Sequence, residues 1–230
     1  MPDHPASTVP DTVVDALFIG RIGPLAGDGA ASAIDKRPVT DARWLDAGGV
    51  AGDTVADPIH HGGPERALNH YPAEHYRLWQ ARYPGFEDAF VPGALGENIS
   101  THGMTEADVH IGDVFRLGQA TVQIAQPRQP CWKIGARTGI AGLARAVAAA
   151  GAAGWLYRVI EPGDIRAGDR LARIETATHG ITLARLWSIQ AARVPDEDDR
   201  RALLRLAELP TLAPEWRKRL AARARQLGER

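Results

Sequence analysis

The sequence contains one cysteine, Cys131, among 230 residues. A single cysteine excludes any disulfide within the chain, and disulfides are mainly a feature of oxidising compartments. The N-terminal stretch, MPDHPASTVP, lacks both the basic flank and the apolar centre of a secretory signal. We therefore expect the protein to be cytoplasmic.

Long hydrophobic runs and a strong net charge are also missing. The longest weakly apolar run, residues 146–156, is rich in alanine and glycine and falls far short of the roughly 20 residues that a membrane-spanning helix needs. The net charge of -1 gives no overall field that would attract nucleic acid. Residues 179–230 carry 11 Lys and Arg against 7 Asp and Glu, but a modestly basic helical surface is ordinarily just solvated. We expect neither a membrane nor nucleic acid as a partner.

The apolar residues that are present follow a strand pattern over most of the chain. Residues 109–124 alternate apolar and polar side chains through two arms, which predicts an antiparallel pair with one buried face. A similar unit recurs at residues 165–174, and short apolar runs at 13–22 and 154–160 predict further strands. Repeated strand units favour a sheet that closes on itself, because closure removes exposed edges. We predict a mostly-β, barrel-like domain over residues 1–178, with residues 1–12 disordered.

Helical spacing appears in three places. Residues 72–82 predict a short helix with Tyr76 and Trp79 in the core, and Ile140 to Val147 carry apolar residues at i, i+3, i+4 and i+7. Beyond Thr178 three amphipathic helices are predicted at 182–192, 196–207 and 212–227. They form a small all-α appendage over residues 179–230, which must dock on the barrel or on a second copy of the chain, as in a homodimer.

The lone cysteine lies in a distinctive setting. Cys131 follows Pro130 and is flanked by Arg128 and Lys133, so two cations favour a thiolate. Such a thiolate would serve as a soft anionic ligand or a nucleophile. The alternative is that Cys131 is a buried small hydrophobic residue, as most lone cysteines are.

Two adjacent histidines, His60 and His61, precede two glycines. A zinc site would need more ligands at suitable spacing. The glycines instead indicate close backbone approach to something bound, with imidazole N–H groups as donors. The alternative is that loop carbonyls satisfy the imidazole of His61.

These segments together resemble a known family. The runs HHGGPERALNHY from His60, GENISTHG from Gly96, the Gly-Asp pair at 112–113 and PRQPC ending at Cys131 occur in this order. In this combination the chain resembles the MOSC domain, the molybdenum-cofactor sulfurase C-terminal family. The helical tail resembles the three-helix extension of the YiiM-like branch.

The resemblance implies a molybdenum cofactor, a pterin dithiolene with an anionic tail, held with Cys131 as catalytic residue and metal ligand. A thiolate suits a soft metal better than oxygen donors do. The resemblance also implies cofactor-binding roles for six further residues: Lys36, Arg66 and Arg128 at the phosphate, Asn98 and Ser100 at the pterin edge, and His61 in the wall. Glu97 either belongs to this site or is a loop carboxylate paired with a cation such as Arg66.

The YiiM-like branch implies an enzyme that reduces N-hydroxylated small molecules, such as N-hydroxylated purine bases. The dinucleotide fingerprint G-x-G-x-x-G is absent, so we expect a separate flavin-type reductase as electron donor. Two other functions stay open. The chain could carry sulfur as a persulfide of Cys131, or carry the cofactor, although the sequence has no pyridoxal-phosphate domain with which to generate sulfur. It could also be a non-catalytic binding module.

Overall fold

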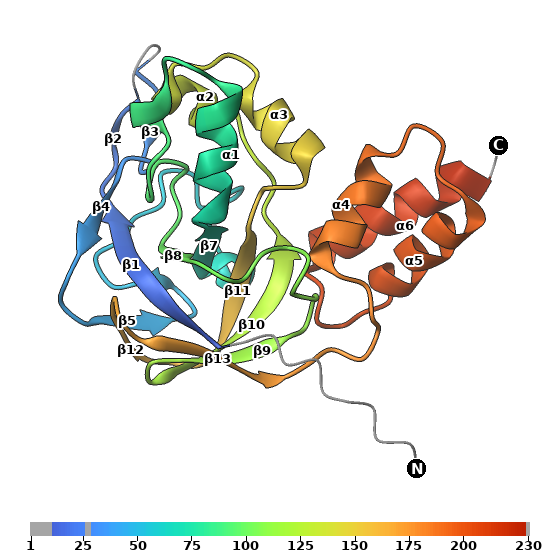
Figure 1. Ribbon diagram of the computed structural model, residues 1–230. Coiled ribbons are helices and arrows are strands. Elements are labelled where there is room, and N and C mark those ends of the chain that lie inside the picture. The colour runs from blue at the N-terminus through green and yellow to red at the C-terminus, as the bar shows by residue number, and fades with distance from the viewer. Residues whose placement is uncertain (1–10, 26–28, 229–230) are drawn as a thin grey trace.

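The computed structural model describes residues 11–25 and 29–228 (Figure 1). The disorder predicted for residues 1–12 falls mostly outside this range. Thr12, the last residue of the predicted disordered segment, contradicts the prediction. It begins strand β1, pairs with Leu171 and donates its hydroxyl to the His102 carbonyl at 2.5 Å. The first strand therefore begins earlier than its apolar run suggests.

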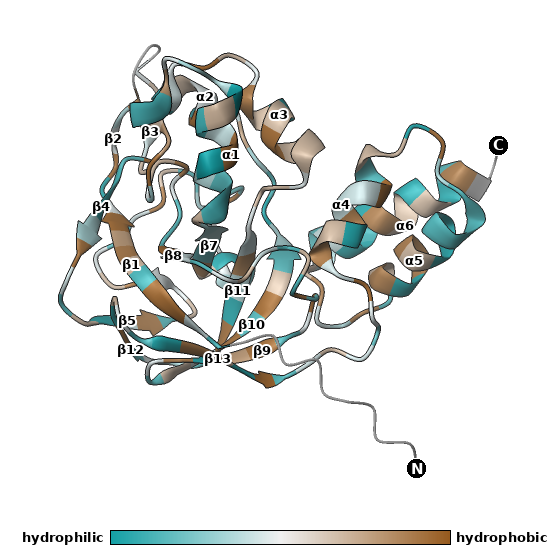
Figure 2. Ribbon diagram, viewed as in Figure 1, coloured by the Kyte–Doolittle hydropathy of each residue, from teal (hydrophilic) through white to brown (hydrophobic). Residues whose placement is uncertain are grey.

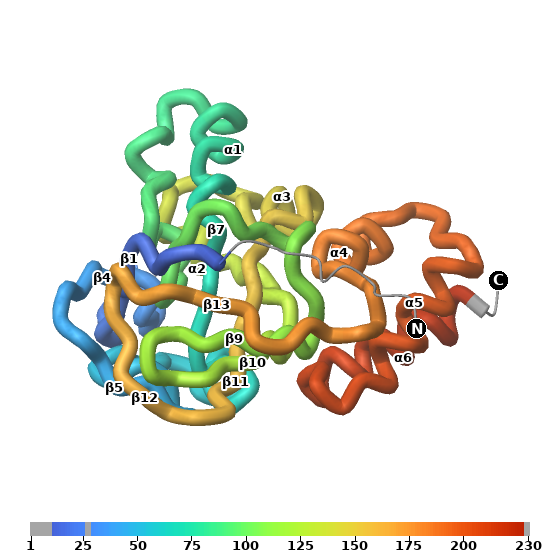
Figure 3. The backbone as a smooth tube through the Cα atoms, turned by 60° about the horizontal axis from the view of Figure 1, so that its bottom comes forward, coloured from blue at the N-terminus to red at the C-terminus, as the bar shows by residue number. Residues whose placement is uncertain are grey.

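Seven strands close into a barrel in the order β13-β9-β10-β11-β7-β8-β1, with β1 pairing back to β13. Strands β7 and β8 are parallel and the other neighbours are antiparallel. Figure 3 views the barrel with the C-terminal helices beside it. The predicted mostly-β, barrel-like fold is confirmed. The barrel strands are β1 (Thr12–Gly20), β7 (Leu68–Pro72), β8 (Ile99–Thr101), β9 (Val114–Leu117), β10 (Ala120–Pro127), β11 (Trp155–Glu161) and β13 (Arg170–Glu175).

Shorter strands lie outside the ring. Strand β4 (Lys36–Val39) extends the sheet on β1, β2 (Gly23–Pro24) pairs with β3 (Ala31–Ser32), and β5 (Arg43–Asp46) pairs with both β6 (Gly49–Val50) and β12 (Gly163–Ile165).

The alternating pattern at 109–124 gives the antiparallel pair β9 and β10, as predicted. The second predicted unit, 165–174, is wrong as a hairpin, because its first arm pairs with β5 and its second with β9 and β1. The turn between them passes the chain from one sheet to another.

Three helices cover one end of the barrel (Figure 1): α1 (Glu74–Arg82), α2 (Lys133–Thr138) and α3 (Leu143–Ala150). Two of them were predicted, although Pro72 ends β7 and does not open α1. Tyr76 and Trp79 are buried, which confirms them as core residues. Helix α2 was not predicted. Single turns of 3-10 helix occur at Pro64–Arg66 and Glu87–Ala89.

The C-terminal helices are α4 (Leu183–Ala191), α5 (Glu197–Ala207) and α6 (Pro214–Gly228). Asp196 caps α5 through a reciprocal capping box with Asp199. The apolar faces of the three helices join the same hydrophobic cluster as the barrel interior, through residues such as Leu183 and Trp187. Figure 2 shows teal, hydrophilic residues along much of the same helices.

We predict that the boundary near Thr178 can be found by limited proteolysis with mass spectrometry. The segment between β13 and α4 contains no regular structure apart from an isolated bridge at Thr182, so its backbone is easier to cut than the strands. The expected protected fragment keeps all barrel strands. A fragment ending inside residues 154–174 would contradict the boundary, because it would lack strands that the barrel needs.

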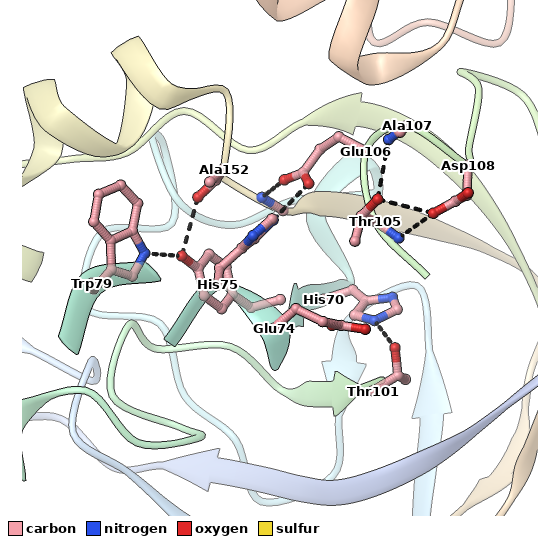
Figure 4. A network of polar contacts seen from close by, with 12 residues as sticks. His70, Glu74, His75, Trp79, Thr101, Thr105, Glu106, Ala107, Asp108 and Ala152 are labelled. Atoms are coloured by element: carbon pink, nitrogen blue, oxygen red, sulfur yellow. Dashed lines mark hydrogen bonds and ion pairs between the residues drawn. The ribbon is translucent and has the colours of Figure 1, made fainter. Parts of the chain in front are cut away.

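A buried polar network braces α1 against the start of β11 (Figure 4). The Glu106 carboxylate accepts the Gly154 N–H at 2.6 Å and contacts His75 Nε2 at 2.7 Å. The Tyr71 hydroxyl donates to the Ala152 carbonyl and accepts the Trp79 indole N–H at 2.6 Å. Gly154 has φ of 75°, and a Cβ there would lie 2.2 Å from the His70 carbonyl oxygen, so only glycine fits.

His70 lies in the same region and should make the protein sensitive to acid. Its ring nitrogens contact the hydroxyls of Tyr157 and Thr101, and complete burial lowers its pKa to about 3. Below about pH 6.5 the unfolded chain binds a proton at this site and the native state does not, so stability falls as the pH drops towards 3.

We predict that His70→Gln, which keeps a donor and an acceptor, removes this pH dependence. Urea unfolding at pH 7 and pH 5 should show the wild type losing about 2 kcal/mol more than the variant, at about 1.4 kcal/mol per pH unit for one proton. All other titrating groups are common to both proteins. An equal loss in the two proteins would contradict the prediction.

Candidate functional site

One pocket gathers most of the residues singled out in the sequence. It is a cavity of about 160 Å³ whose walls come from the segments around residues 32–36, 48–57, 61–69 and 95–98 and from the end of β10 with the start of α2. These segments are distant in sequence, and the closed barrel brings them together. The predicted residues that line it are Lys36, His61, Arg66, Asn98, Arg128 and Cys131.

Cys131 is half-buried in this pocket. Its segment leaves β10 at Pro127, and the Arg128 N–H donates to the Gly154 carbonyl at 3.0 Å. Its own carbonyl accepts the N–H of Ile134 in α2 at 3.3 Å. The cysteine is thus held between the barrel and a short helix, and the geometry argues against a purely buried core residue.

Lys36 and Asn98 are joined through Asp53. The Asp53 carboxylate accepts the Gly20 N–H at 2.6 Å and the Asn98 amide at 2.8 Å, and it pairs with the Lys36 ammonium. The Asn98 amide also donates to the Phe18 carbonyl and accepts the Asn69 N–H. Both hydrogens of that amide are therefore engaged inside the protein, which limits what Asn98 can donate to a ligand.

Lys36 is a charge held away from water. Its side chain is 9% exposed, and burial lowers its pKa while the adjacent Asp53 carboxylate raises it. The two opposite charges largely cancel, so the pair adds little net charge to the pocket. The charge of Lys36 is therefore compensated by a protein carboxylate.

Arg128 and Lys133 differ from Lys36 in their partners. Arg128 is 9% exposed and donates to the Leu95 carbonyl, and its guanidinium lies 6.0 Å from the Tyr71 ring centre. Lys133 donates to the Ala31 carbonyl at 3.3 Å. Among residues 11–25 and 29–228, neither forms an ion pair. These two cations, on either side of Cys131, make this wall of the pocket positive.

Arg66 and His61 both line the pocket. The Arg66 guanidinium donates to the Gly62 carbonyl at 3.1 Å and pairs with Glu215 of α6. Desolvation, with Lys133 close by, lowers the pKa of His61, which favours its neutral imidazole at pH 7. A Cβ on Gly62 would lie 2.9 Å from the Pro58 carbonyl oxygen, so the close approach at Gly62 is to its own loop, whereas a Cβ on Gly63 would meet no atom within 4 Å.

Glu97 does not pair with Arg66, and that interpretation is wrong. Its carboxylate is fully buried, accepts the Tyr76 hydroxyl at 2.5 Å and the Gly93 N–H at 2.6 Å, and keeps one oxygen without a partner. Desolvation raises the pKa of Glu97. The carboxyl is a structural element behind the pocket wall.

Ser100 lies outside the pocket. It is fully buried in β8, and its hydroxyl donates to the Tyr71 carbonyl at 3.1 Å across the parallel β7–β8 pair. Its only hydroxyl hydrogen is used there, and complete burial separates its oxygen from the pocket, so we leave Ser100 out of the proposed site.

Sequence reasoning missed two residues of the site. Asp53 was not singled out in the sequence, although it organises one wall. Lys133 was noted only as a neighbour of Cys131, although it lines the pocket itself. Its spacing of two from Cys131 was the available signal.

Two features, a membrane-spanning helix and a cluster of metal-binding side chains, are absent from the residues that the structure describes. Residues 11–25 and 29–228 hold no helix with the length and hydropathy of a membrane span. The same residues hold no group of three or more His, Cys, Asp and Glu side chains that could bind a metal ion between them.

Comparison with known proteins identifies the family. Residues 57–172, which include the two-histidine loop, the GENIS run and Cys131, match the model of the MOSC domain. The chain belongs to the MOSC family. It is 38% identical over 199 residues to the protein YiiM of Escherichia coli strain K12, an alignment that covers 85% of this chain and 86% of that one. This MOSC chain belongs to the YiiM-like branch.

A solved structure and a second relative add detail. The crystal structure of YiiM from Geobacillus stearothermophilus superposes with a TM-score of 0.76 at 28% identity, covering 93% of this chain and 99% of that one. A protein of Gibberella moniliformis named reductase is 37% identical over 159 residues, which are 68% of this chain and 28% of the fungal protein. A segment similar to this chain therefore occurs within a much longer protein that is named a reductase.

Proposed function

We propose that this MOSC chain binds the molybdenum cofactor in the pocket around Cys131 and reduces N-hydroxylated small molecules with electrons from a separate flavin-type reductase. The observation that carries the proposal is the meeting of the chain's only thiol with an anion-attracting wall in one cavity. A soft metal that arrives on a phosphate-bearing ligand needs both features.

The residues present fit such a group. Cys131 is half-buried and supplies one soft ligand. Arg128 and Lys133 have backbone carbonyl partners but no carboxylate partner among the described residues, so each can take an anion. The bound cofactor would supply two-electron redox chemistry.

The chain's own residues would then bind the cofactor and orient the substrate in the pocket. Arg128, with its planar fork of donors, and Lys133 would hold the anionic tail. The Lys36–Asp53 pair and Asn98 would fix the opposite wall. His61, whose pKa is lowered, would present its imidazole to a small substrate in the pocket. Converting an N-hydroxyl group to an N–H consumes two electrons and two protons and releases water.

We predict that the purified chain, loaded with molybdenum, reduces an N-hydroxylated purine base with a reduced viologen and shows no turnover with NADPH alone. The reason is that the sequence carries no dinucleotide fingerprint. Metal quantification and product analysis by chromatography would test this. Robust turnover with NADPH and no second protein would refute the need for a partner.

The same preparation separates the other two functions. A labile persulfide on Cys131 without bound molybdenum would favour a sulfur carrier. A preparation that contains neither bound molybdenum nor a persulfide would favour a binding module. Each of these outcomes contradicts the proposed reductase.

A further inference from the structure

The C-terminal helix α6 contacts Arg66, which lines the pocket, and Gln129, which lies beside the pocket residue Arg128 in the chain. On one side Glu215, in its first turn, pairs with Arg66, which is 149 residues away in sequence. On the other side Arg219 donates to the side chain of Gln129, two residues before Cys131. We propose that Glu215 is a positioning residue that holds Arg66 ready for an anionic ligand, which gives the helical appendage a role in the site. The proposal rests on the proposed function for the identity of that ligand.

The position of α6 against the barrel is fixed by contacts that do not involve Glu215. The Ala213 N–H donates to the Ala125 carbonyl of β10 at 2.9 Å. The Leu212 and Leu220 side chains are fully buried in the cluster shared with the barrel. A substitution at Glu215 therefore leaves the helix where it is.

Arg66 and Glu215 differ sharply in exposure. The Arg66 side chain is 18% exposed and lines the pocket, whereas the Glu215 side chain is 72% exposed. An exposed ion pair contributes little to stability, about 0–1 kcal/mol. The effect of Glu215 should therefore appear in ligand binding more than in folding.

Arg66 gains order from its two contacts. A free arginine side chain has many rotamers, and fixing them upon binding costs affinity. Here one terminal nitrogen is held by the Gly62 carbonyl and the other by Glu215, so the planar group is already oriented. Its remaining N–H groups can face a phosphate without a further loss of rotamers.

The charge of Glu215 works in the opposite direction, since a carboxylate beside Arg66 repels an anion. Two variants separate the effects. Glu215→Gln removes the charge and keeps an oxygen that accepts from Arg66, while Glu215→Ala removes both. If Glu215 positions Arg66, the alanine variant binds an anion more weakly and the glutamine variant does not.

The test uses the full-length chain from a host unable to make the cofactor, titrated with inorganic phosphate by calorimetry. We expect Glu215→Ala to raise the Kd about 2- to 10-fold and Glu215→Gln to leave it equal or lower. Both effects should vanish in an Arg66→Met background, because a double-mutant cycle isolates the pair. Glu197→Ala is the matched control, since its carboxylate pairs with Arg200 within α5. Thermal melts check that each variant is folded.

Four results would overturn the proposal: no phosphate binding by the wild type, no change in Glu215→Ala, tighter binding in both Glu215 variants, or an effect that persists without Arg66. Molybdenum content is measured separately on cofactor-loaded protein. A chain that binds phosphate with the expected cycle but takes up no molybdenum would contradict the proposed function and leave the role of Glu215 standing.

Discussion

Cys131→Ser is expected to abolish viologen-driven turnover almost completely while leaving the melting temperature close to that of the wild type. A serine hydroxyl is a harder donor than a thiolate, and its high pKa leaves it neutral, so the metal would lose its protein ligand with little change in volume. The half-buried position of Cys131 means that a hydroxyl there can reach water. Arg128 and Lys133 are unchanged and should keep part of the cofactor through its anionic tail.

The measurement compares molybdenum content, thermal melts and turnover for both proteins made in a host that produces the cofactor. If Cys131 served only in packing, a buried hydroxyl without a partner would cost about 1–3 kcal/mol. For a chain of this size that cost lowers the melting temperature by roughly 2–4 °C per kcal/mol. Full activity in the serine variant would end the ligand hypothesis, and loss of activity with a collapsed melt would support the packing role.

Asp53→Ala should destabilise the fold by about 3 kcal/mol, because removing one member of a buried ion pair leaves the other charge uncompensated. The Lys36 side chain is 9% exposed, and the Gly20 N–H and one Asn98 N–H would also lose their acceptor. Burial already lowers the pKa of Lys36, and loss of the carboxylate would lower it further. The unfolded chain then binds the proton more tightly than the native state, so the stability of the variant should recover as the pH rises above 7.

Urea unfolding at pH 7 and pH 9 would measure both effects. The double variant Asp53→Ala with Lys36→Met is the control, since replacing both members by apolar groups is often close to neutral. It should regain most of the lost stability and show no recovery with pH. A double variant as unstable as Asp53→Ala would show that the backbone and Asn98 contacts matter more than the charge.

The features that sequence reasoning found are local in sequence. Alternation at 109–124 marks which side chains face the core, and the structure has β9 and β10 there. The same kind of pattern at 165–174 failed, because alternation specifies a face and says nothing about which strand will pair. Helix α2 escaped notice because six residues carry too little periodic signal.

The candidate site followed from the resemblance, and its internal contacts did not. Six of the seven predicted residues line one pocket, but the sequence did not reveal the residues with which they form ion pairs. Lys36 and Asp53 are 17 residues apart, and Arg66 and Glu215 are 149 apart. Pairings over such distances depend on the order and register of the strands in the barrel, which a single sequence does not reveal.

The closure of the barrel through β1 and β13 also determines when the pocket can form during synthesis. Thr12 pairs with Leu171, so one of the first ordered strands must wait for one of the last barrel strands to leave the ribosome. Contacts so distant in sequence make folding slow, and until they form the strand edges are open to other chains. Lys36 is held on the β1 side of the pocket and Arg128 at the end of β10. A ligand that engages both therefore needs the barrel to be closed, which requires the chain to be made through β13. If the protein binds the cofactor as proposed, it would take it up after synthesis of the whole barrel.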